Sequence, residues 1–237
     1  KPFALSMTGG YLGATDGYRA SVTASGTTQL GAGEFDYRLT YGKMDQGNRQ
    51  TPDGELDPSS TEDKTRSMHL GYRQGDHYIS FKAQAYDLAA DVYTDEPGFL
   101  ISLPNRDLRK YALTYEGRNL TPWLNLLSVS AYQQTVDRVF TNDVTIMAGP
   151  GRTMTILSTS DDDQKTKGLD LRAEMSFSAR SRTVVGLQYE DDRLETNKTT
   201  TIAPAPSSQR EDEARIRTWS VFGQHEIDLS DALTANV

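Results

Sequence analysis

Histidine, acidic and cysteine residues decide which chemistry this sequence of 237 residues can perform. Cysteine is absent, which excludes a thiolate zinc site, a cysteine nucleophile and a disulfide-rich secreted fold. The three histidines, His69, His77 and His225, lie outside the long connections described below, so no serine, histidine and acidic trio meets there. The sequence therefore predicts neither a catalytic site nor a resident cofactor.

The acidic residues gather in short runs at 161–163, 191–192 and 211–213. The first run consists of three aspartates, whose hard carboxylate oxygens suit calcium. A solvated acidic loop explains each run without a metal and is the favoured interpretation. No metal site is therefore predicted.

Charge and hydropathy exclude two further classes. Lys+Arg 25 against Asp+Glu 33 gives a formal net charge of −8, whereas nucleic-acid binding needs a basic stripe. Hydrophobic residues make up 36%, below the roughly 45% of a soluble domain, and no run approaches the ~20 apolar residues of a membrane-spanning helix. The start, Lys1-Pro2-Phe3, does not read as a signal peptide, which predicts a mature or excised fragment.

Apolar and polar residues alternate along many short stretches of the chain. In 35–42 and 169–177 the odd positions are apolar or aromatic and the even ones are mostly polar or charged. A period of two is typical of a β-strand with one apolar and one polar face. The alternation recurs at 3–8, 18–25, 68–73, 79–86, 110–116, 127–132, 185–190 and 219–224, with an incomplete strand at about 232–237. The pattern predicts about eleven strands and no helix.

The connections between these strands alternate strictly in length. The short ones are polar and rich in turn-forming residues: 31–33, 74–76, 119–122, 178–182 and 228–231. The long ones are 12–17, 45–64, 90–106, 137–166 and 192–214. An antiparallel meander therefore places every long loop at one end, which is typical of an outer-membrane β-barrel with short periplasmic turns and long extracellular loops.

The two strand faces favour the same class. The polar face carries both signs of charge, as the lining of an aqueous lumen does: Asp36, Arg38, Arg73, Lys82, Lys110, Glu116, Asp170, Arg172 and Glu174. Tyrosines on the apolar face are candidates for interfacial girdles: Tyr37, Tyr41, Tyr72, Tyr115 and Tyr189. A soluble β-sandwich binding module is the alternative that alternation alone leaves open.

Eleven is an odd number, whereas bacterial single-chain barrels have an even number of strands. An open strand edge in lipid leaves backbone groups without hydrogen bonds, each at a cost of several kcal/mol. We therefore expect residues 1–237 to form part of a larger barrel, such as half of one with 22 strands.

Residues 217–233 resemble a barrel hairpin of TonB-dependent outer-membrane receptors. A strand containing Phe222-Gly223-Gln224-His225-Glu226 is followed there by the short turn Leu229-Ser230-Asp231-Ala232-Leu233. Residues 34–39 and 70–73 are similar to early barrel strands of the same family. The resemblance extends as a pattern over nearly the whole chain. It implies a 22-stranded barrel with an N-terminal plug and a TonB box, neither of which we find in residues 1–237, so one partial barrel domain is expected.

The resemblance also implies where a ligand binds. In this family the contacts come from loop bases and plug apices, so the candidate residues are the aromatic and arginine residues near the long loops. These are Tyr93, Phe99, Arg106, Arg138, Phe140 and Arg193. Arginine pairs with carboxylate or catecholate oxygens, and aromatic rings stack on flat chelators.

The predicted function is energy-coupled uptake of a metal chelate, with a ferric siderophore as the first expectation, in a bacterial outer membrane. Expected partners are outer-membrane lipid, lipopolysaccharide, the TonB energy complex through the plug, and the chelate. Haem or cobalamin uptake is one alternative, and His69, on the polar face, is the candidate haem ligand. A porin or autotransporter-type barrel is another.

Overall fold

The computed structural model describes residues 2–203 and 205–237, and this part of the chain is almost entirely β-structure. The strands are β1 (Ala4–Leu12), β2 (Gly17–Leu30), β3 (Gly33–Gln46), β4 (Arg49–Thr51), β5 (Gly54–Leu56), β6 (Thr61–Gln74), β7 (His77–Val92), β8 (Phe99–Arg118), β9 (Leu124–Gly149), β10 (Arg152–Ser178), β11 (Ser181–Ile202), β12 (Ser208–Ser230) and β13 (Leu233–Asn236). Within these residues no helix is long and apolar enough to cross a membrane.

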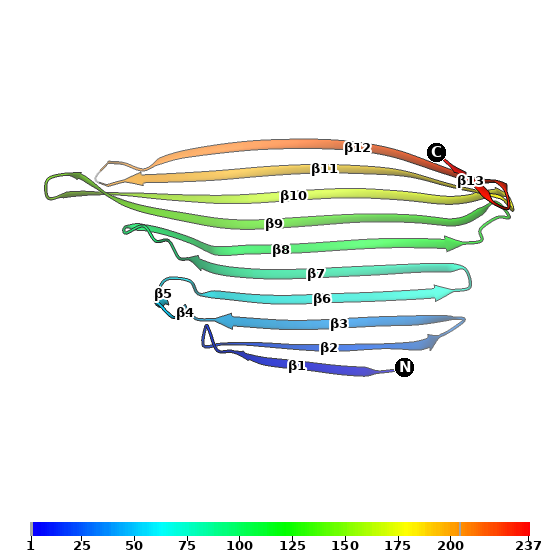
Figure 1. The fold of residues 1–237 in the computed structure, drawn as a ribbon, viewed down its shortest axis with the longest axis horizontal. Helices are drawn as coiled ribbons and strands as arrows, with labels where there is room; N and C mark the ends of the chain where they lie inside the picture. Colours follow the sequence, from blue (N-terminus) through cyan, green and yellow to red (C-terminus); the bar gives the residue numbers. More distant parts are fainter. Residues whose placement is uncertain (1, 204) are drawn as a thin grey trace.

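Eleven strands form one antiparallel sheet in which each strand pairs with its neighbours in the chain (Figure 1). The order is β1-β2-β3-β6-β7-β8-β9-β10-β11-β12-β13, while β4 and β5 form a separate hairpin. The predicted all-β meander of about eleven strands is confirmed. The sheet does not close on itself, because β1 and β13 are its two ends.

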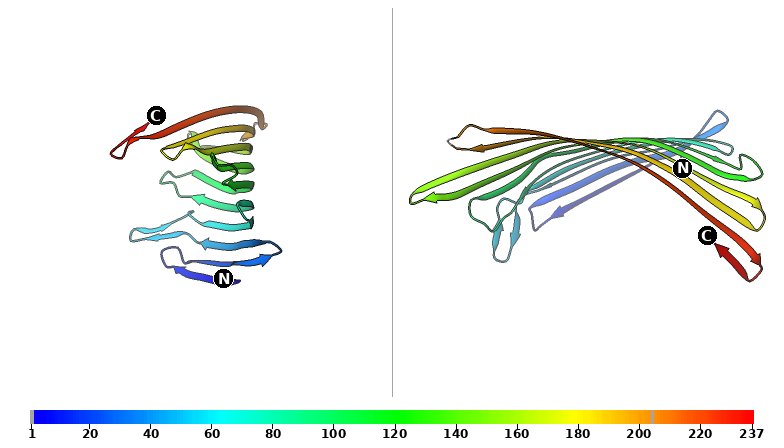
Figure 2. Two further views of the ribbon diagram at one scale, coloured as in Figure 1. Left: turned by 90° about the vertical axis from the view of Figure 1, so that its right-hand side faces the viewer. Right: turned by 90° about the horizontal axis from the view of Figure 1, so that it is seen from above.

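The sheet is a single curved layer with nothing packed against either face (Figure 2). Among the described residues no hydrophobic side chain is buried, and large ones such as Met7 and Val221 are 72% and 80% exposed. A β-sandwich needs a second sheet about 10 Å away and a dry core between the two. The soluble-sandwich alternative is therefore wrong.

Strand register gathers the apolar side chains on one face. One row of cross-strand partners runs from β3 to β12: Phe35, Tyr72, Ile79, Tyr115, Val129, Leu171, Leu187 and Val221. The predicted girdle tyrosines lie on this side, which we call the apolar face. Because side chains alternate along a strand, a slip of one residue in any pairing would move a strand's apolar side chains to the other side.

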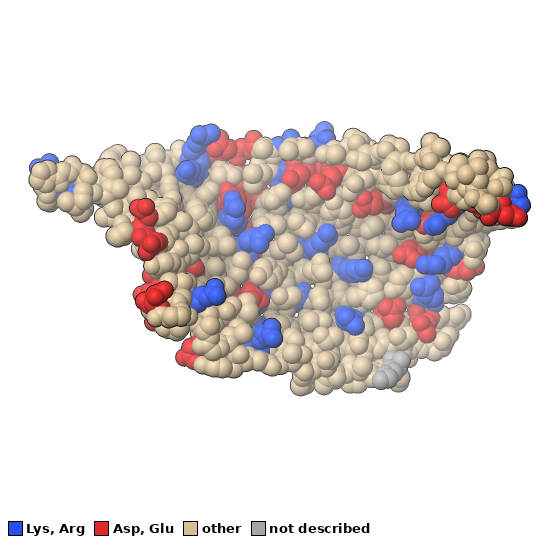
Figure 3. Space-filling model, viewed as in Figure 1, with Lys and Arg blue, Asp and Glu red and all other residues tan. Residues whose placement is uncertain are grey.

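The opposite side, which we call the polar face, carries the charged residues predicted for a lumen. Arg38 pairs in register with His69, and His69 with Lys82. Figure 3 shows one side of the sheet, with basic and acidic side chains interspersed from end to end. Such a surface is stable only in contact with water or polar groups.

The short turns occur where they were predicted, but the long connections are shorter than expected. β9 and β10 are joined only by residues 150–151, and β11 and β12 only by residues 203–207. The loops predicted at 137–166 and 192–214 are therefore wrong over most of their length. These stretches are strand extensions in which apolar and polar residues are mixed on both faces, so apolar alternation fails to reveal them. The longest extensions lie at the left end of β9 and β10 in Figure 1.

The apolar band has the height of a hydrocarbon layer. On β10 the outward side chains are apolar from Leu169 to Phe177, while the strand itself is 27 residues long. A membrane-crossing β-strand needs about 9–11 residues. The remaining part of β10, from Arg152 to Gly168, therefore projects beyond the band on the side of the long connections.

Leu187 and Gln188 of β11 test the assignment of the two faces, because they are neighbours that point to opposite sides. We expect Leu187→Arg to prevent assembly of the full-length protein in a bilayer, since an arginine facing hydrocarbon costs up to roughly 2–4 kcal/mol. Gln188→Arg places the same side chain beside Asp170 and should assemble normally. Heat-modifiable migration on gels measures assembly, and equal tolerance of both variants would contradict the orientation.

Candidate functional site

Four of the six predicted ligand residues lie together on the polar face of β8 and β9, toward the long connections. Arg106 and Arg138 are direct register partners, and Phe140 follows Arg138 by two residues on the same face. Phe99, the first residue of β8, pairs with Val144, which lies nearer the turn between β9 and β10. The structure thus brings two guanidinium groups and an aromatic ring into one area, which we call the arginine cluster.

Asp162 of β10 is a member of this area that sequence patterning missed. Arg138 donates to Asp162 through Nε at 2.9 Å, and its second guanidinium nitrogen contacts the same oxygen. Asp162 is only 5% exposed and also accepts a hydrogen bond from Ser160 at 2.9 Å. The solvated acidic loop predicted at 161–163 is therefore wrong, because these residues lie within β10 and alternate between its faces. Alternation continued through the run would have revealed this.

The two remaining candidates lie elsewhere. Tyr93 is in the connection between β7 and β8, where its hydroxyl donates to Asp95 at 3.3 Å. Arg193 is on the apolar side of β11, where it pairs with Glu195 at 2.7 Å and with Glu213 at 2.9 Å. Arg193 therefore lies on the opposite side of the sheet from the arginine cluster.

His69 lies on the polar face, as predicted, within a hydrogen-bonded group near the short-turn end. Its Nε2 is 2.9 Å from Oδ1 of Asp36 and 3.0 Å from the hydroxyl of Tyr78. The Tyr78 ring in turn lies 4.6 Å below the guanidinium of Arg73. Nε2 of His69 is thus engaged by two protein partners, and an iron could reach this atom only by displacing them.

The other two histidines are engaged in the same way. His77 Nδ1 is 2.8 Å from the Tyr115 hydroxyl, and His225 Nδ1 is 2.8 Å from the Thr183 hydroxyl. Among the described residues no group of three or more histidine and acidic side chains is arranged to hold a metal ion.

Tyr132 lies flat across the polar face at mid-height and ties three strands together. Its ring covers Gly168 of β10, where any Cβ would collide with it, and its hydroxyl donates to Glu190 of β11 at 2.7 Å. The ammonium of Lys110 is 4.7 Å from the ring centre. Glycine at 168 thus allows a large side chain to lie along the sheet rather than project into the space in front of it.

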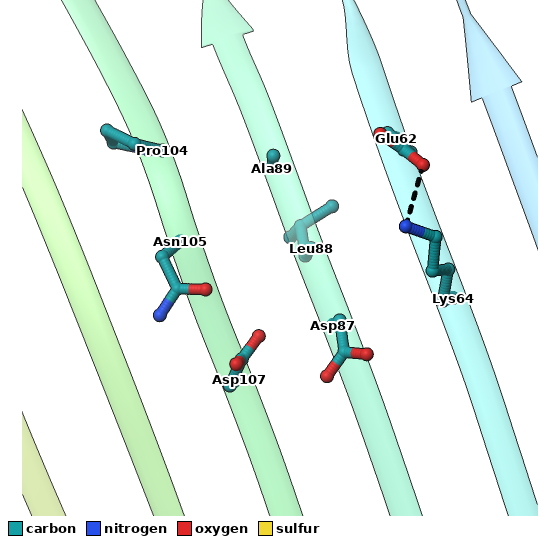
Figure 4. A pocket seen from close by; sticks show the side chains of 8 residues that line it. All are labelled: Glu62, Lys64, Asp87, Leu88, Ala89, Pro104, Asn105 and Asp107. Carbon is teal, nitrogen blue, oxygen red and sulfur yellow. Dashed lines mark ion pairs between the residues drawn. The ribbon is translucent and has the colours of Figure 1, made fainter.

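A small hollow on the apolar side marks an irregularity between β7 and β8. The register shifts between Leu88 and Ala90 and between Ser102 and Asn105, beside Pro104. Proline has no N–H for the ladder, which explains a bulge there. Figure 4 shows the lining side chains, including Lys64, whose ammonium pairs with Glu62 at 3.0 Å. The hollow lies on the side away from the arginine cluster.

The β4–β5 hairpin is held to the loop end by side-chain hydrogen bonds. Asn48 donates to Glu55 at 2.8 Å and to Asp57 at 2.9 Å. Hydrogen bonds from Gln50 and Asn48 lower the pKa of the Glu55 carboxyl below its ordinary value. The hairpin is therefore a folded element at the rim, rather than part of the unstructured loop predicted at 45–64.

We expect Gly168→Leu to destabilise the folded protein by roughly 1–3 kcal/mol, because the new side chain displaces the Tyr132 ring. Tyr132→Phe keeps the ring and removes only the hydrogen bond to Glu190, which costs about 1 kcal/mol. The midpoint of guanidinium unfolding in liposomes measures both changes. An unaltered midpoint for Gly168→Leu would show that Tyr132 does not need the space above residue 168.

Comparison with solved structures finds similar sheets in larger proteins. The copper transporter OprC superposes with a TM-score of 0.71 at 14% sequence identity, covering 96% of this chain and 34% of OprC. The ferric yersiniabactin uptake receptor FyuA from Yersinia pestis gives 0.58 at 11% identity, covering 96% of this chain and 39% of FyuA. This chain thus spans little more than a third of either structure, and the likeness is one of fold. No protein-family model and no curated protein matches the sequence.

Proposed function

We propose that this chain is part of the barrel of a TonB-dependent outer-membrane transporter that takes up a metal chelate. One observation carries the proposal: the sheet is a single layer with no buried apolar residue, and its apolar side chains form a band about one hydrocarbon layer high. In water such a face would be an aggregation site, whereas in a bilayer it is satisfied by lipid.

The strand count supports a larger barrel. An eleven-stranded sheet with two unpaired ends needs further strands before every backbone group in the lipid is hydrogen-bonded. This chain covers only 34% and 39% of the two similar solved structures, of which one is named as a transporter and the other as an uptake receptor. A plug domain and the TonB energy complex are the partners that such a barrel requires for active transport.

The arginine cluster supports a negatively charged chelate as the substrate. Arg106 has no ion pair in the part of the chain that the structure describes, and it lies beside Arg138 on the polar face. Guanidinium groups bind carboxylate and catecholate oxygens through charge-assisted hydrogen bonds, and Phe140 offers a ring for stacking. With no metal-binding cluster among the described residues, a chelated metal fits better than a bare ion. A ferric siderophore is our first choice, and a copper chelate is the second, because OprC is named for copper.

Arg106→Ala tests the ligand site in the full-length protein. Loss of one charge-assisted hydrogen bond of about 1.5–3 kcal/mol predicts a roughly 10- to 100-fold weaker affinity for the transported chelate. The probes are radiolabelled ferric catecholate and ferric hydroxamate siderophores and a copper chelate, offered to whole cells. Arg66→Ala removes an arginine side chain from the apolar side of β6 and is the matched control. Equal binding of the chelate by both variants would show that the arginine cluster is not part of the ligand site.

Energy dependence separates this proposal from a porin. Uptake of the bound chelate should stop when the inner-membrane potential is dissipated, because release into the periplasm requires work on a plug, while binding at the cell surface should persist. Both are measured as radiolabel retained with and without a protonophore. Uptake that continues unchanged in de-energised cells would instead favour a passive pore.

A further inference from the structure

Apolar side chains surround the arginine cluster, although most of the polar face is charged or polar. Leu88 is the register partner of Arg106. In the next row toward the short turns, Leu108 pairs with Tyr86 on one side and with Val136 on the other. Leu103, which pairs with Ala90, lies on the same face beyond Arg106. We call five of these residues the hydrophobic patch: Tyr86, Leu88, Leu103, Leu108 and Val136.

The hydrophobic patch is a local feature of the polar face, because the adjacent row nearer the short turns is polar. That row of register partners consists of Ser67, Gln84, Lys110, Gln134, Thr166 and Asp192. The wall of an aqueous lumen is polar in general. Apolar side chains gathered at one place on such a wall indicate a surface that binds something.

No other described part of the chain covers the hydrophobic patch. Its five side chains are half-buried by their neighbours on the sheet alone, because the sheet is a single layer (Figure 2). Val136 pairs with Gln164, which lies five residues, or roughly 16 Å along β10, from Leu169 at the edge of the apolar band. The hydrophobic patch therefore lies beyond the band, on the side of the long connections.

The two arginines of the cluster differ in whether their charge is neutralised. Arg138 donates to Asp162 through Nε at 2.9 Å. Arg106 forms no ion pair within residues 2–203 and 205–237, and its guanidinium carries five N–H donors. Arg106 therefore presents a positive charge without a carboxylate partner at the centre of the hydrophobic patch.

We propose that the transported chelate is amphipathic, with an anionic group bound by Arg106 and an alkyl chain lying on Leu108 and Val136. The inference rests on the proposed function and narrows its substrate class. Apolar contacts around a charge-assisted hydrogen bond exclude water, and the lower local dielectric strengthens the bond. Four of the five patch side chains are aliphatic and offer no ring for stacking, which favours an alkyl chain over an aromatic group.

The surface is large enough for such a chain. The hydrophobic patch crosses three strands, about 10 Å, and extends roughly 16 Å along β8 from Leu108 to Leu103. A chelate built from oxygen donors alone would bind Arg106 and leave these apolar side chains in water. A chelate with an alkyl chain removes them from water in the same binding event.

A plug domain is the other occupant that a barrel wall offers this surface to. The unneutralised charge of Arg106 favours the chelate, whose donor oxygens carry negative charge. The two occupants also predict different effects of removing the apolar side chains. A plug packed on the patch makes that loss affect every chelate alike, whereas an alkyl chain packed there makes it affect only chelates that carry one.

Two double variants of the full-length protein test the proposal. The patch variant is L108T/V136T, and the control variant is L126T/V184T. Leu126 and Val184 are both register partners of Glu174 on the polar face, near the short turns. The control thus makes the same two substitutions on the same face, roughly 33 Å along β9 from Val136.

The probes are a radiolabelled synthetic ferric tris-catecholate and the same chelate with one octyl chain, which have equal charge. Binding is measured on whole cells treated with a protonophore. Cells that lack the protein give the amount of octyl chelate that partitions into lipid. Heat-modifiable migration reports the assembly of each variant independently.

We expect the wild type to bind the octyl chelate roughly 30-fold more tightly than the unsubstituted one, from the burial of a few methylene groups. The patch variant should lose most of this preference and bind the unsubstituted chelate as the wild type does. The control variant should keep the preference. Equal affinity of the two chelates for the wild type, or an unchanged preference in the patch variant, would overturn the proposal. Equal weakening of both chelates in the patch variant would assign the surface to protein packing and overturn it too.

Failure of this inference is distinguishable from failure of the transport proposal. Binding of both chelates without an octyl preference, followed by energy-dependent uptake, would refute the amphipathic substrate and leave transport standing. Absence of binding of either chelate to the assembled wild type would refute uptake of a ferric catecholate and the inference with it.

Discussion

A continuous apolar face with no protein to pack against is the constraint on which the rest of the structure depends. The strand register aligns apolar side chains in continuous rows from β3 to β12. Because no other part of the chain covers these side chains, only something outside the sheet can remove them from water. In the function we propose, lipid supplies this removal from water, and two consequences follow. The backbone has to be hydrogen-bonded throughout, and the opposite face is free to be polar.

The large side chains of the polar face lie along the sheet instead of projecting from it. Tyr132 over Gly168 and Tyr78 over Gly71 lie along the sheet and reach carboxylates on the next strand but one. Large side chains thereby brace adjacent strands without filling the space before them. A barrel that encloses a plug or passes a chelate needs open space in front of this face, whereas a soluble protein would use the same positions for a packed core.

The sequence predicted the fold well wherever one face meets hydrocarbon and the other meets water. Leu169–Phe177 alternates cleanly, and its strand, faces and turn were all identified. Beyond the band neither face is consistently apolar, so residues 153–166 carry no sustained alternating signal although they are strand. The same lack of signal put Arg193 among the ligand candidates and missed Asp162, because neither residue could be assigned a face from a stretch taken to be a loop.

Beyond the apolar band, the molecule consists of paired strands in place of irregular loops. About seventeen residues of β10 stand clear of the band, paired with β9 and, from Ile156 onward, also with β11. At ~3.3 Å per residue and a tilt near 40°, the turn at Pro150 is held about 40 Å from the apolar band. An epitope grafted into that turn would be displayed at a fixed distance from the band.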